Sequence, residues 1–252
     1  MLDFLKPSVA ALQDFCILAG RALRNVFRPP HYESDILLQM DIIGVGSLPI
    51  VILIGFFTGI VITMQMSRAL AQYGAVDQVG PIVAITLVRE LGPVLTAILV
   101  AGRNASGIAS ELGSMKVTEQ IDAMRALGTD PIQKLVTPRM IATAVMLPLL
   151  TIVSDFVGLI GGYVIARLSI GLSTMQYWTS AYRAIEYNDI TQGLLKPFVF
   201  AFMVSLVGCF YGLRTSGGTQ GVGHATTQAV VVSSVWIFVL TSVLTRIFVN
   251  LN

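Results

Sequence analysis

The sequence predicts an all-α polytopic membrane protein, made of an N-terminal interfacial helix, five transmembrane helices and a short polar helix on the cytoplasmic side. Hydrophobic residues make up 54% of its 252 residues and charged residues only 12%, about half the charged share of soluble domains. The mean hydropathy is +0.77. Because roughly 20 apolar residues cross the hydrocarbon core as a helix, long uncharged runs indicate transmembrane helices. Such runs occupy residues 42–67, 91–102, 140–154, 197–213 and 215–245.

Residues 1–30 predict an amphipathic helix that lies along the membrane surface. Pro7 suits a first helical turn, and Pro29 bars continuation. Arg21 and Arg24 lie off the apolar stripe, where they can face anionic headgroups. An ordinary amphipathic helix packed on the rest of the protein is the alternative interpretation.

Residues 31–252 are predicted to form one transmembrane domain. Its five spans are expected at about residues 43–67, 80–102, 140–166, 190–213 and 227–248. With a cytoplasmic N-terminus, the inner loops hold ten of the 16 lysines and arginines and the outer loops four, while the other two lie within spans. Cytoplasmic loops are enriched in these residues. The N-terminus is therefore expected in the cytoplasm and the C-terminus outside.

Glycines spaced four residues apart predict close helix packing in two of the spans. Gly55 and Gly59 form one such pair in the first span, and Gly158 and Gly162 form another in the third. Small residues at this spacing let two helix backbones approach each other.

The polar segment between the second and third spans predicts a short helix over about residues 118–127. Thr118 suits its N-cap, Glu119 its positive first turn and Arg125 its negative last turn. Gly128 suits the left-handed position after the helix. A helix of about ten residues is marginal alone because nucleation is costly. We therefore expect it to pack against another protein at the membrane face.

Charges inside the predicted spans are the strongest functional signals, since each costs about 2.5–3.5 kcal/mol. They are Arg89, Glu90, Asp155 and Lys196. Glu90 and Lys196 lie at compatible depths for an ion pair, which leaves Arg89 for a phosphate, a carbonyl or a symmetry mate. A pair that only fixes helix register is the alternative. For Asp155 we expect a structural hydrogen bond.

Other motifs predict no catalytic or metal site. Cys16 and Cys209 lack metal-ligand spacing and are interpreted as packing residues, and His31 and His224 lack partner ligands. The glycine-rich residues 217–223 lack the order of a phosphate-binding loop and are expected to form a turn. The net charge of +2 gives no support for nucleic-acid binding. We expect no enzymatic activity in this chain.

Two longer stretches carry a family resemblance. Residues 88–139, VRELGPVLTAILVAGRNASGIASELGSMKVTEQIDAMRALGTDPIQKLVTPR, resemble the signature region of the MlaE/YrbE permeases, and residues 221–234, GVGHATTQAVVVSS, are similar to the family's pre-terminal motif. These permeases are the membrane subunits of ABC transporters that move phospholipids between bacterial membranes. The resemblance implies a transport subunit in the inner membrane that maintains outer-membrane lipid asymmetry.

The resemblance also implies partners. They are a second copy of the chain, a cytoplasmic ABC ATPase that carries ATP and Mg²⁺, a STAS-domain protein, a periplasmic MCE-domain hexamer and the phospholipid itself. No cofactor is expected in this chain, and no nucleic acid.

Site residues are implied in the same way. Residues 111–131 are similar to the element that couples the family's permeases to the ATPase, with candidate residues Glu111, Glu119, Asp122, Arg125 and Gly128. Lipid-binding candidates are Leu70, Tyr73, Arg89, Glu90 and Lys196. Some relatives carry an acidic residue in the last span, whereas this chain has residues 235–238, VWIF, there.

Two rival functions stay open at this point. The four charges within spans also suit an ion- or proton-coupled secondary transporter, although five spans do not divide into inverted repeats. A membrane scaffold with purely architectural charges is the second rival.

Overall fold

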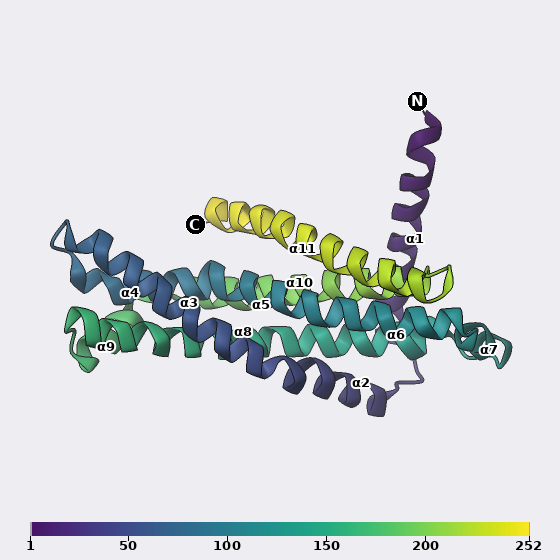
Figure 1. Cartoon of the computed structure of the whole chain (residues 1–252), viewed down its shortest axis with the longest axis horizontal. Helices are drawn as coiled ribbons and strands as arrows, with labels where there is room; N and C mark the ends of the chain where they lie inside the picture. The colour runs from purple at the N-terminus through teal and green to yellow at the C-terminus, as the bar shows by residue number, and fades with distance from the viewer. Residues whose placement is uncertain (1, 252) are drawn as a thin grey trace. The chain divides into compact units, whose positions relative to one another are not determined.

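The computed structural model describes residues 2–251, and the side chains of residues 9–169 and 171–250. In those residues the regular elements are helices (Figure 1), which confirms the predicted all-α class. They are α1 (Leu2–Val26), α2 (Glu33–Met40), α3 (Gly46–Ala71), α4 (Val79–Thr86), α5 (Gly92–Val100), α6 (Ser106–Val117), α7 (Gln120–Ala126), α8 (Thr137–Ile165), α9 (Thr174–Ala184), α10 (Tyr187–Leu213) and α11 (Gly218–Leu251). Wider π-helical turns occur at Asp41–Val45, Leu87–Leu91, Ala101–Ala105, Ile132–Val136 and Ala166–Ile170, and a 3-10 turn at Val76–Gln78.

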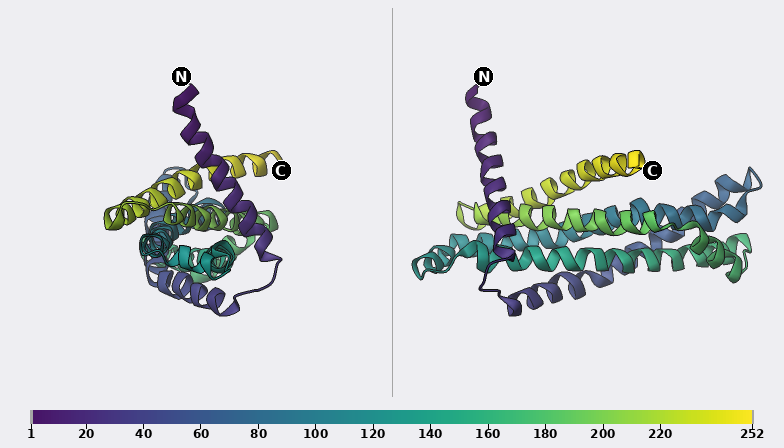
Figure 2. Two further views of the ribbon diagram at one scale, coloured as in Figure 1. Left: turned by 90° about the vertical axis from the view of Figure 1, so that its right-hand side faces the viewer. Right: turned by 180° about the vertical axis from the view of Figure 1, so that it is seen from behind.

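Within residues 2–251, five continuous helical stretches are long and apolar enough to cross a membrane, as the sequence predicted. They are Glu33–Ala71, Val76–Val117, Ile132–Ser169, Tyr187–Leu213 and Gly218–Asn250. Several run beyond the predicted spans because π-helical turns continue the backbone instead of ending it. The second predicted span, residues 80–102, thus extends through the turn Ala101–Ala105 and α6 to Val117. Helix α7 then forms the connection toward α8 (Figure 2).

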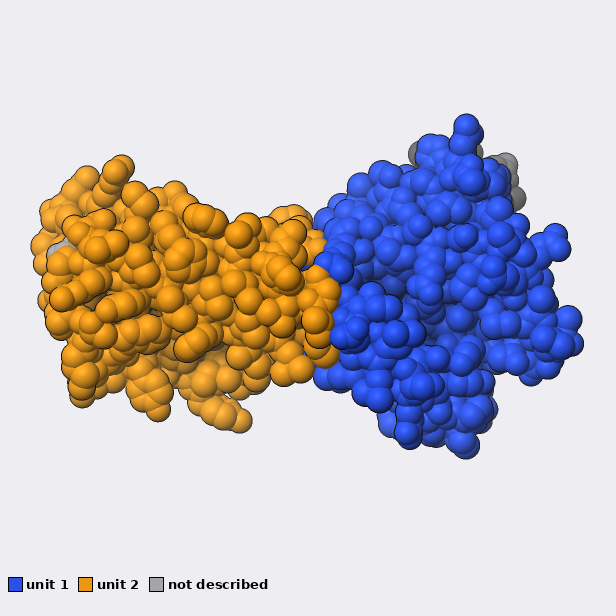
Figure 3. Space-filling view, turned by 60° about the horizontal axis from the view of Figure 1, so that its bottom comes forward, with its two compact units in different colours: residues 1–43, 100–145, 201–236 blue, residues 44–99, 146–200, 237–252 orange. Residues whose placement is uncertain are grey.

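Contacts divide the chain into two compact units (Figure 3). Unit 1 contains residues 1–43, 100–145 and 201–236, and unit 2 contains residues 44–99, 146–200 and 237–252. Helices α8, α10 and α11 each contribute residues to both units. The division into an N-terminal helix and one transmembrane domain over residues 31–252 stays a prediction.

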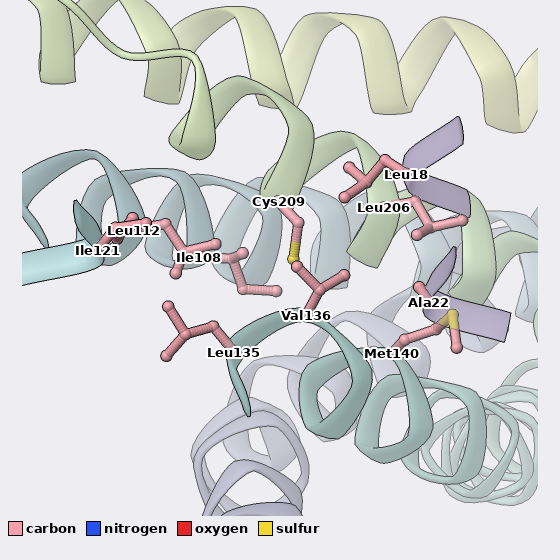
Figure 4. Close-up of a cluster of buried hydrophobic side chains, with 10 residues drawn as sticks. All are labelled: Leu18, Ala22, Ile108, Leu112, Ile121, Leu135, Val136, Met140, Leu206 and Cys209. Atoms are coloured by element: carbon pink, nitrogen blue, oxygen red, sulfur yellow. The ribbon is translucent and has the colours of Figure 1, made fainter. Parts of the chain in front are cut away.

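The core of unit 1 gathers side chains from five helical segments (Figure 4). Its members are Leu18, Ala22, Ile108, Leu112, Ile121, Leu135, Val136, Met140, Leu206 and Cys209. Ile121 belongs to the polar helix α7 and is fully buried, so it fixes this helix to the core. Cys209 is a packing residue as predicted, whereas Cys16 is exposed.

Helix α1 packs on unit 1 with the second half of its apolar stripe. Leu18 and Ala22 are buried there, while Val9 and Leu12 nearer the N-terminus are exposed. The side chain of Arg214 donates to Asp14 over 3.1 Å, which adds a polar contact between α1 and the turn after α10. These contacts support the alternative of a helix packed on the protein, and the interfacial location stays a prediction.

Glycines bring α3 and α8 close together in unit 2, which confirms the predicted close packing. A Cβ atom on Gly59 would collide with the carbonyl of Gly158, and one on Gly55 would lie 2.8 Å from the carbonyl oxygen of Ser154. Because both neighbours are backbone atoms, neither position can accept a side chain unless the helices move apart.

Candidate functional site

A buried ion pair joins the second and fourth spans in unit 2. The ammonium of Lys196, on α10, donates to the carboxylate of Glu90 over 2.6 Å and to the hydroxyl of Thr245, on α11, over 3.0 Å. That hydroxyl donates to Glu90 over 3.0 Å. The side chain of Lys196 is fully buried and that of Glu90 is 36% exposed. The predicted Glu90–Lys196 pair is therefore confirmed, with Thr245 as an additional member.

The backbone around Glu90 supplies the third acceptor of Lys196. Glu90 lies in the π-helical turn Leu87–Leu91, which is followed by Pro93. Proline has no N–H, so Pro93 cannot donate to the carbonyl of Arg89 in the helical ladder. Lys196 donates to this carbonyl over 2.9 Å. A lysine with three donors thus meets three acceptors, the number that its ammonium requires.

The side chain of Arg89 pairs with Asp189 at the start of α10. The sequence left Arg89 for a phosphate, a carbonyl or a symmetry mate and did not predict this partner, whereas a phosphate contact through its other donors stays a prediction. Asp189 is fully buried, and its second carboxylate oxygen accepts from the backbone N–H of Glu186 over 2.9 Å. Asp189, in the first turn of α10, therefore bonds back to the residue that precedes the helix and orients Arg89 at the same time.

The structural hydrogen bond expected for Asp155 is absent at Oδ1 among the described residues. Its Oδ1 atom is buried and has no hydrogen-bond partner within residues 9–169 and 171–250. The carboxylate packs against the Cα atom of Gly92, where a side chain would collide with it. The N–H of Gly92 is already used, since it donates to the carbonyl of Leu87 in the π-helical turn.

Leu70 and Tyr73 lie at the end of α3, apart from the ion pairs. Leu70 is partly buried against the cluster of Val79, Val83 and Leu87, and Tyr73 is 82% exposed. Neither residue hydrogen-bonds to Glu90 or Lys196 among the described side chains. The structure thus brings Arg89, Glu90 and Lys196 together but does not join Leu70 and Tyr73 to them.

The polar helix α7 carries a small network of charges around Asp122. Lys116 donates to one carboxylate oxygen over 2.7 Å, and Arg125 donates to the other over 2.9 Å. The hydrogen bond from Lys116 is the main reason that the pKa of Asp122 is below its ordinary value, and Arg125 contributes further. All three side chains are exposed enough for a partner to reach them.

The beginning of α7 differs from the prediction. The hydroxyl of Thr118 donates to the carbonyl of Ser114 over 2.8 Å, so Thr118 ends α6 and is not an N-cap for α7. Glu119 takes the cap position with φ +60° and makes no side-chain cap bond. This left-handed residue makes the sharp turn between two helices that directly follow each other.

The end of α7 agrees with the prediction. Arg125 lies in its last turn, and Gly128 is left-handed with φ +78°. The N–H of Gly128 donates to the carbonyl of Arg125, and the N–H of Thr129 donates to that of Met124, both over 3.0 Å. This pair of bonds is the Schellman motif.

Glu111 lies on α6 and not on the polar helix itself. Its carboxylate pairs over 2.8 Å with Arg139, a buried residue near the start of α8. The pair fixes α6 against α8 in unit 1, directly before the turn that carries α7. A role of Glu111 in coupling stays a prediction.

Comparison with known proteins gives the family. The family model described as Permease MlaE matches residues 36–247. The chain belongs to the MlaE permease family. A probable ABC transporter permease protein of Rickettsia prowazekii is 38% identical over 234 residues, which are 93% of this chain and 90% of that protein. A probable ABC transporter permease protein of Synechocystis is 40% identical, over 88% of this chain and 84% of that protein.

A plant protein is also similar to this MlaE-family permease. The chloroplastic protein TRIGALACTOSYLDIACYLGLYCEROL 1 of Arabidopsis thaliana is 38% identical over 92% of this chain and 66% of its own length. The family and these names identify the chain as an ABC transporter permease and a multi-pass membrane protein.

Two members of the permease's ion-pair network were missed by sequence reasoning. Thr245 lies in a long uncharged run, where a threonine carries no signal of a polar partner. Asp189 lies directly before the predicted fourth span, so it was placed in a loop. Pro93, three residues after Glu90, was the available signal for an unpaired carbonyl at Arg89.

Proposed function

We propose that this MlaE-family permease moves phospholipids between the inner and outer membranes of a bacterium and so contributes to outer-membrane lipid asymmetry. The proposal rests chiefly on the network of Glu90, Lys196 and Thr245 inside otherwise apolar helices. Intramembrane charges are costly and commonly mark a substrate path. The name of the Arabidopsis relative, which contains that of a glycolipid, supports a lipid substrate for the family.

Arg89 and Glu90 are the groups in this network that a headgroup can reach. Both side chains are 36% exposed, whereas Lys196 and Asp189 are fully buried. The ion pair with Asp189 uses Nε of Arg89, and a guanidinium has four further N–H donors. We propose that these donors bind the lipid phosphate while apolar helix surfaces accommodate the acyl chains. Leu70 and Tyr73 are proposed as lining at the end of α3.

The partners follow from the same proposal. An ABC permease works with an ATPase, and we propose that ATP and Mg²⁺ bind on that separate cytoplasmic subunit. The exposed α7, with Asp122, Arg125 and the 83% exposed Leu127, is the proposed docking element. Glu119 and Gly128 support it from the flanking turns, and Glu111 from the preceding helix α6. ATP-driven closure of the ATPase would push on α7 and change the lipid site.

Further assembly is proposed from the family resemblance and the orientation argument. The proposed transporter in the inner membrane also contains a second permease copy, a STAS-domain protein on the ATPase and a periplasmic MCE-domain hexamer. The loop charges favour a cytoplasmic N-terminus and a periplasmic C-terminus. An ion-coupled carrier is less favoured, because Glu90 and Lys196, and Arg89 and Asp189, already neutralise each other, so a relay would have to rely on Asp155.

Lipid transfer by the reconstituted complex tests the proposal. The permease and its ATPase are placed in vesicles with a fluorescent phospholipid, and ATP-dependent transfer is measured. The charge-free double variant Glu90→Gln/Lys196→Met should lose transfer, and the control Thr143→Val, a buried site in unit 1, should retain it. Wild-type transfer by the double variant would show that the network is not the lipid site. Transfer that follows an ion gradient without ATP would support the secondary transporter.

A further inference from the structure

A small cavity in unit 1, mostly apolar but with a few polar side chains in its wall, has no role in the function proposed above. It has a volume of about 250 Å³ and lies between the α2 region and the stretch that leads into α6. Gln39, Arg103, Asn104 and Glu111 supply its polar lining, and Ile42 and Ile108 are part of its apolar wall. Every lining residue belongs to unit 1.

Asn104 indicates what the cavity binds. The residue is only 5% exposed, and its Nδ2 donor is buried without a hydrogen-bond acceptor among the described residues. Leaving a buried donor unpaired costs free energy, so such groups are rare and call for a ligand or another explanation. An amide nitrogen only donates, so the matching ligand atom must be an acceptor.

A second unpaired donor lies beside the cavity. Arg139 pairs with the lining residue Glu111, and its Nε atom is also buried without an acceptor among the described side chains. Arg103 lines the cavity itself and adds another positive charge. Glu111 is the one carboxylate in this set, and Arg139 already neutralises it. The chemistry of the site therefore favours an anion with several acceptor oxygens.

The position along the helix suggests the source of this anion. Asn104 lies two residues beyond residue 102, where the predicted second span ends, and Glu111 follows about 10 Å further along at about 1.5 Å per residue. The helical stretch Val76–Val117 is 42 residues long, about twice what the hydrocarbon core requires, so part of it extends beyond the core. With the core crossed by the predicted residues 80–102, the cavity lies at the level of the polar headgroups. The isoleucines of the wall suit the glycerol and the first carbons of an acyl chain.

We propose that this cavity binds the phosphate of a phospholipid headgroup in the leaflet next to α7. Asn104 donates to a phosphate oxygen, and Arg103 neutralises the charge. The choice of phospholipid over another phosphate compound rests on the proposed function. The site is separate from Arg89 and Glu90, which belong to unit 2. A lipid held here would be bound by the cytoplasmic half of the helices.

Native mass spectrometry of the full-length permease with its ATPase tests the site. The probe is phosphatidylglycerol, added to the delipidated complex, and the lipid retained per permease chain is measured. Asn104→Leu should weaken retention of one lipid about tenfold, the effect of one lost hydrogen bond to a charged group. Arg103→Gln, an exposed substitution, should weaken it by a similar factor. Thr143→Val, which removes a buried hydroxyl bonded only to its own helix, should have no effect.

Folding and ligand source are separated by two further measurements. Because Nδ2 of Asn104 has no acceptor among the described residues, Asn104→Leu should not lower the melting temperature of the delipidated complex. A drop of several degrees would mean that Asn104 has an internal partner and would overturn the proposal. Unchanged lipid retention in both variants would overturn it as well. Inorganic phosphate is then added at about 10 mM, well above the dissociation constant of a micromolar site. If it displaces the lipid completely, the site binds free phosphate and the lipid assignment is wrong.

The test is independent of the transport proposal. The double variant Glu90→Gln/Lys196→Met should keep the lipid that depends on Asn104, because its changes lie in the other unit. If this variant transfers lipid normally while Asn104→Leu loses its bound lipid, the transport site is wrong and the headgroup cavity stands. If instead the double variant loses transfer while Asn104→Leu keeps its bound lipid, the cavity proposal is wrong and the proposed transport site stands.

Discussion

The ammonium of Lys196 lies 2.6 Å from the carboxylate of Glu90, although the two residues are 106 positions apart. Lys196 also donates to Thr245, so the pair connects segments from three of the five spans. The lysine is fully buried in apolar surroundings, and its charge is tolerated only because every donor has an acceptor. The pair that stabilises these spans is therefore also the proposed lipid site, so variants of it test both.

Removing one partner of this pair should lower the stability of the permease more than removing both charges. Lys196→Met leaves the Glu90 carboxylate and the Arg89 carbonyl without their donor, and we expect a loss of about 3 kcal/mol in the free energy of unfolding. The double variant Glu90→Gln/Lys196→Met should recover a large part of that loss. The measurement is unfolding of the purified permease in mixed detergent. A double variant that is as unstable as Lys196→Met alone would show that the pair is not coupled.

The charges on α7 should matter for turnover and not for folding. The double variant Asp122→Ala/Arg125→Ala removes an exposed network, so we expect an unchanged melting temperature but loss of permease-stimulated ATP hydrolysis. The matched control is Asp14→Ala/Arg214→Ala, which removes another exposed ion pair of unit 1. Normal assembly and turnover of the Asp122/Arg125 variant would contradict the docking role of α7.

Acid should weaken the network around Asp122 in a defined pH range. Lys116, mainly through its hydrogen bond, holds the pKa of Asp122 below the ordinary value of 3.8. A carboxyl whose pKa is lowered on folding contributes stability above its unfolded pKa, and this contribution is lost as the pH falls through the folded pKa. The protection of the α7 amides against hydrogen exchange, corrected for the pH dependence of intrinsic exchange, should therefore hold at pH 5 and fall below about pH 4. In Lys116→Gln the pKa of Asp122 lies closer to its unfolded value, so the loss of protection should be smaller and complete at a higher pH. An identical profile in both proteins would contradict the assignment.

The sequence was sufficient to predict the five membrane spans and one ion pair between residues far apart in the chain, Glu90 and Lys196. Long apolar runs determine the five spans because membrane thickness sets helix length. Glu90 and Lys196 could be paired because two rare charges occurred at matching depths. Asp189 and Thr245 could not be found in this way. Acidic residues in loops and single threonines in membrane helices are common, and neither has to lie at a particular depth in the membrane.

The residues that begin and end the helices were only partly predictable, because some of them can form more than one local structure. Gly128 was recognised because only glycine readily adopts its left-handed conformation, which the structure confirms. Thr118 was misassigned because its hydroxyl can either cap the following helix or bond back to the preceding one, and it does the latter. The π-helical turns, which extend the second span, have no periodic signature.

Tight contact between α3 and α8 makes Gly59 the most sensitive glycine of unit 2. A methyl group there would collide with the carbonyl of Gly158, and a backbone atom cannot move aside like the end of a side chain. Gly59→Ala should therefore lower the free energy of unfolding by about 1–3 kcal/mol as the helices separate. Gly20→Ala is the matched control, because the space around Gly20 on α1 is open and alanine favours a helix by about 0.5–1 kcal/mol. Opposite shifts of the two variants in detergent unfolding are expected, and equal stabilisation by both would show that the two helices do not pack this closely.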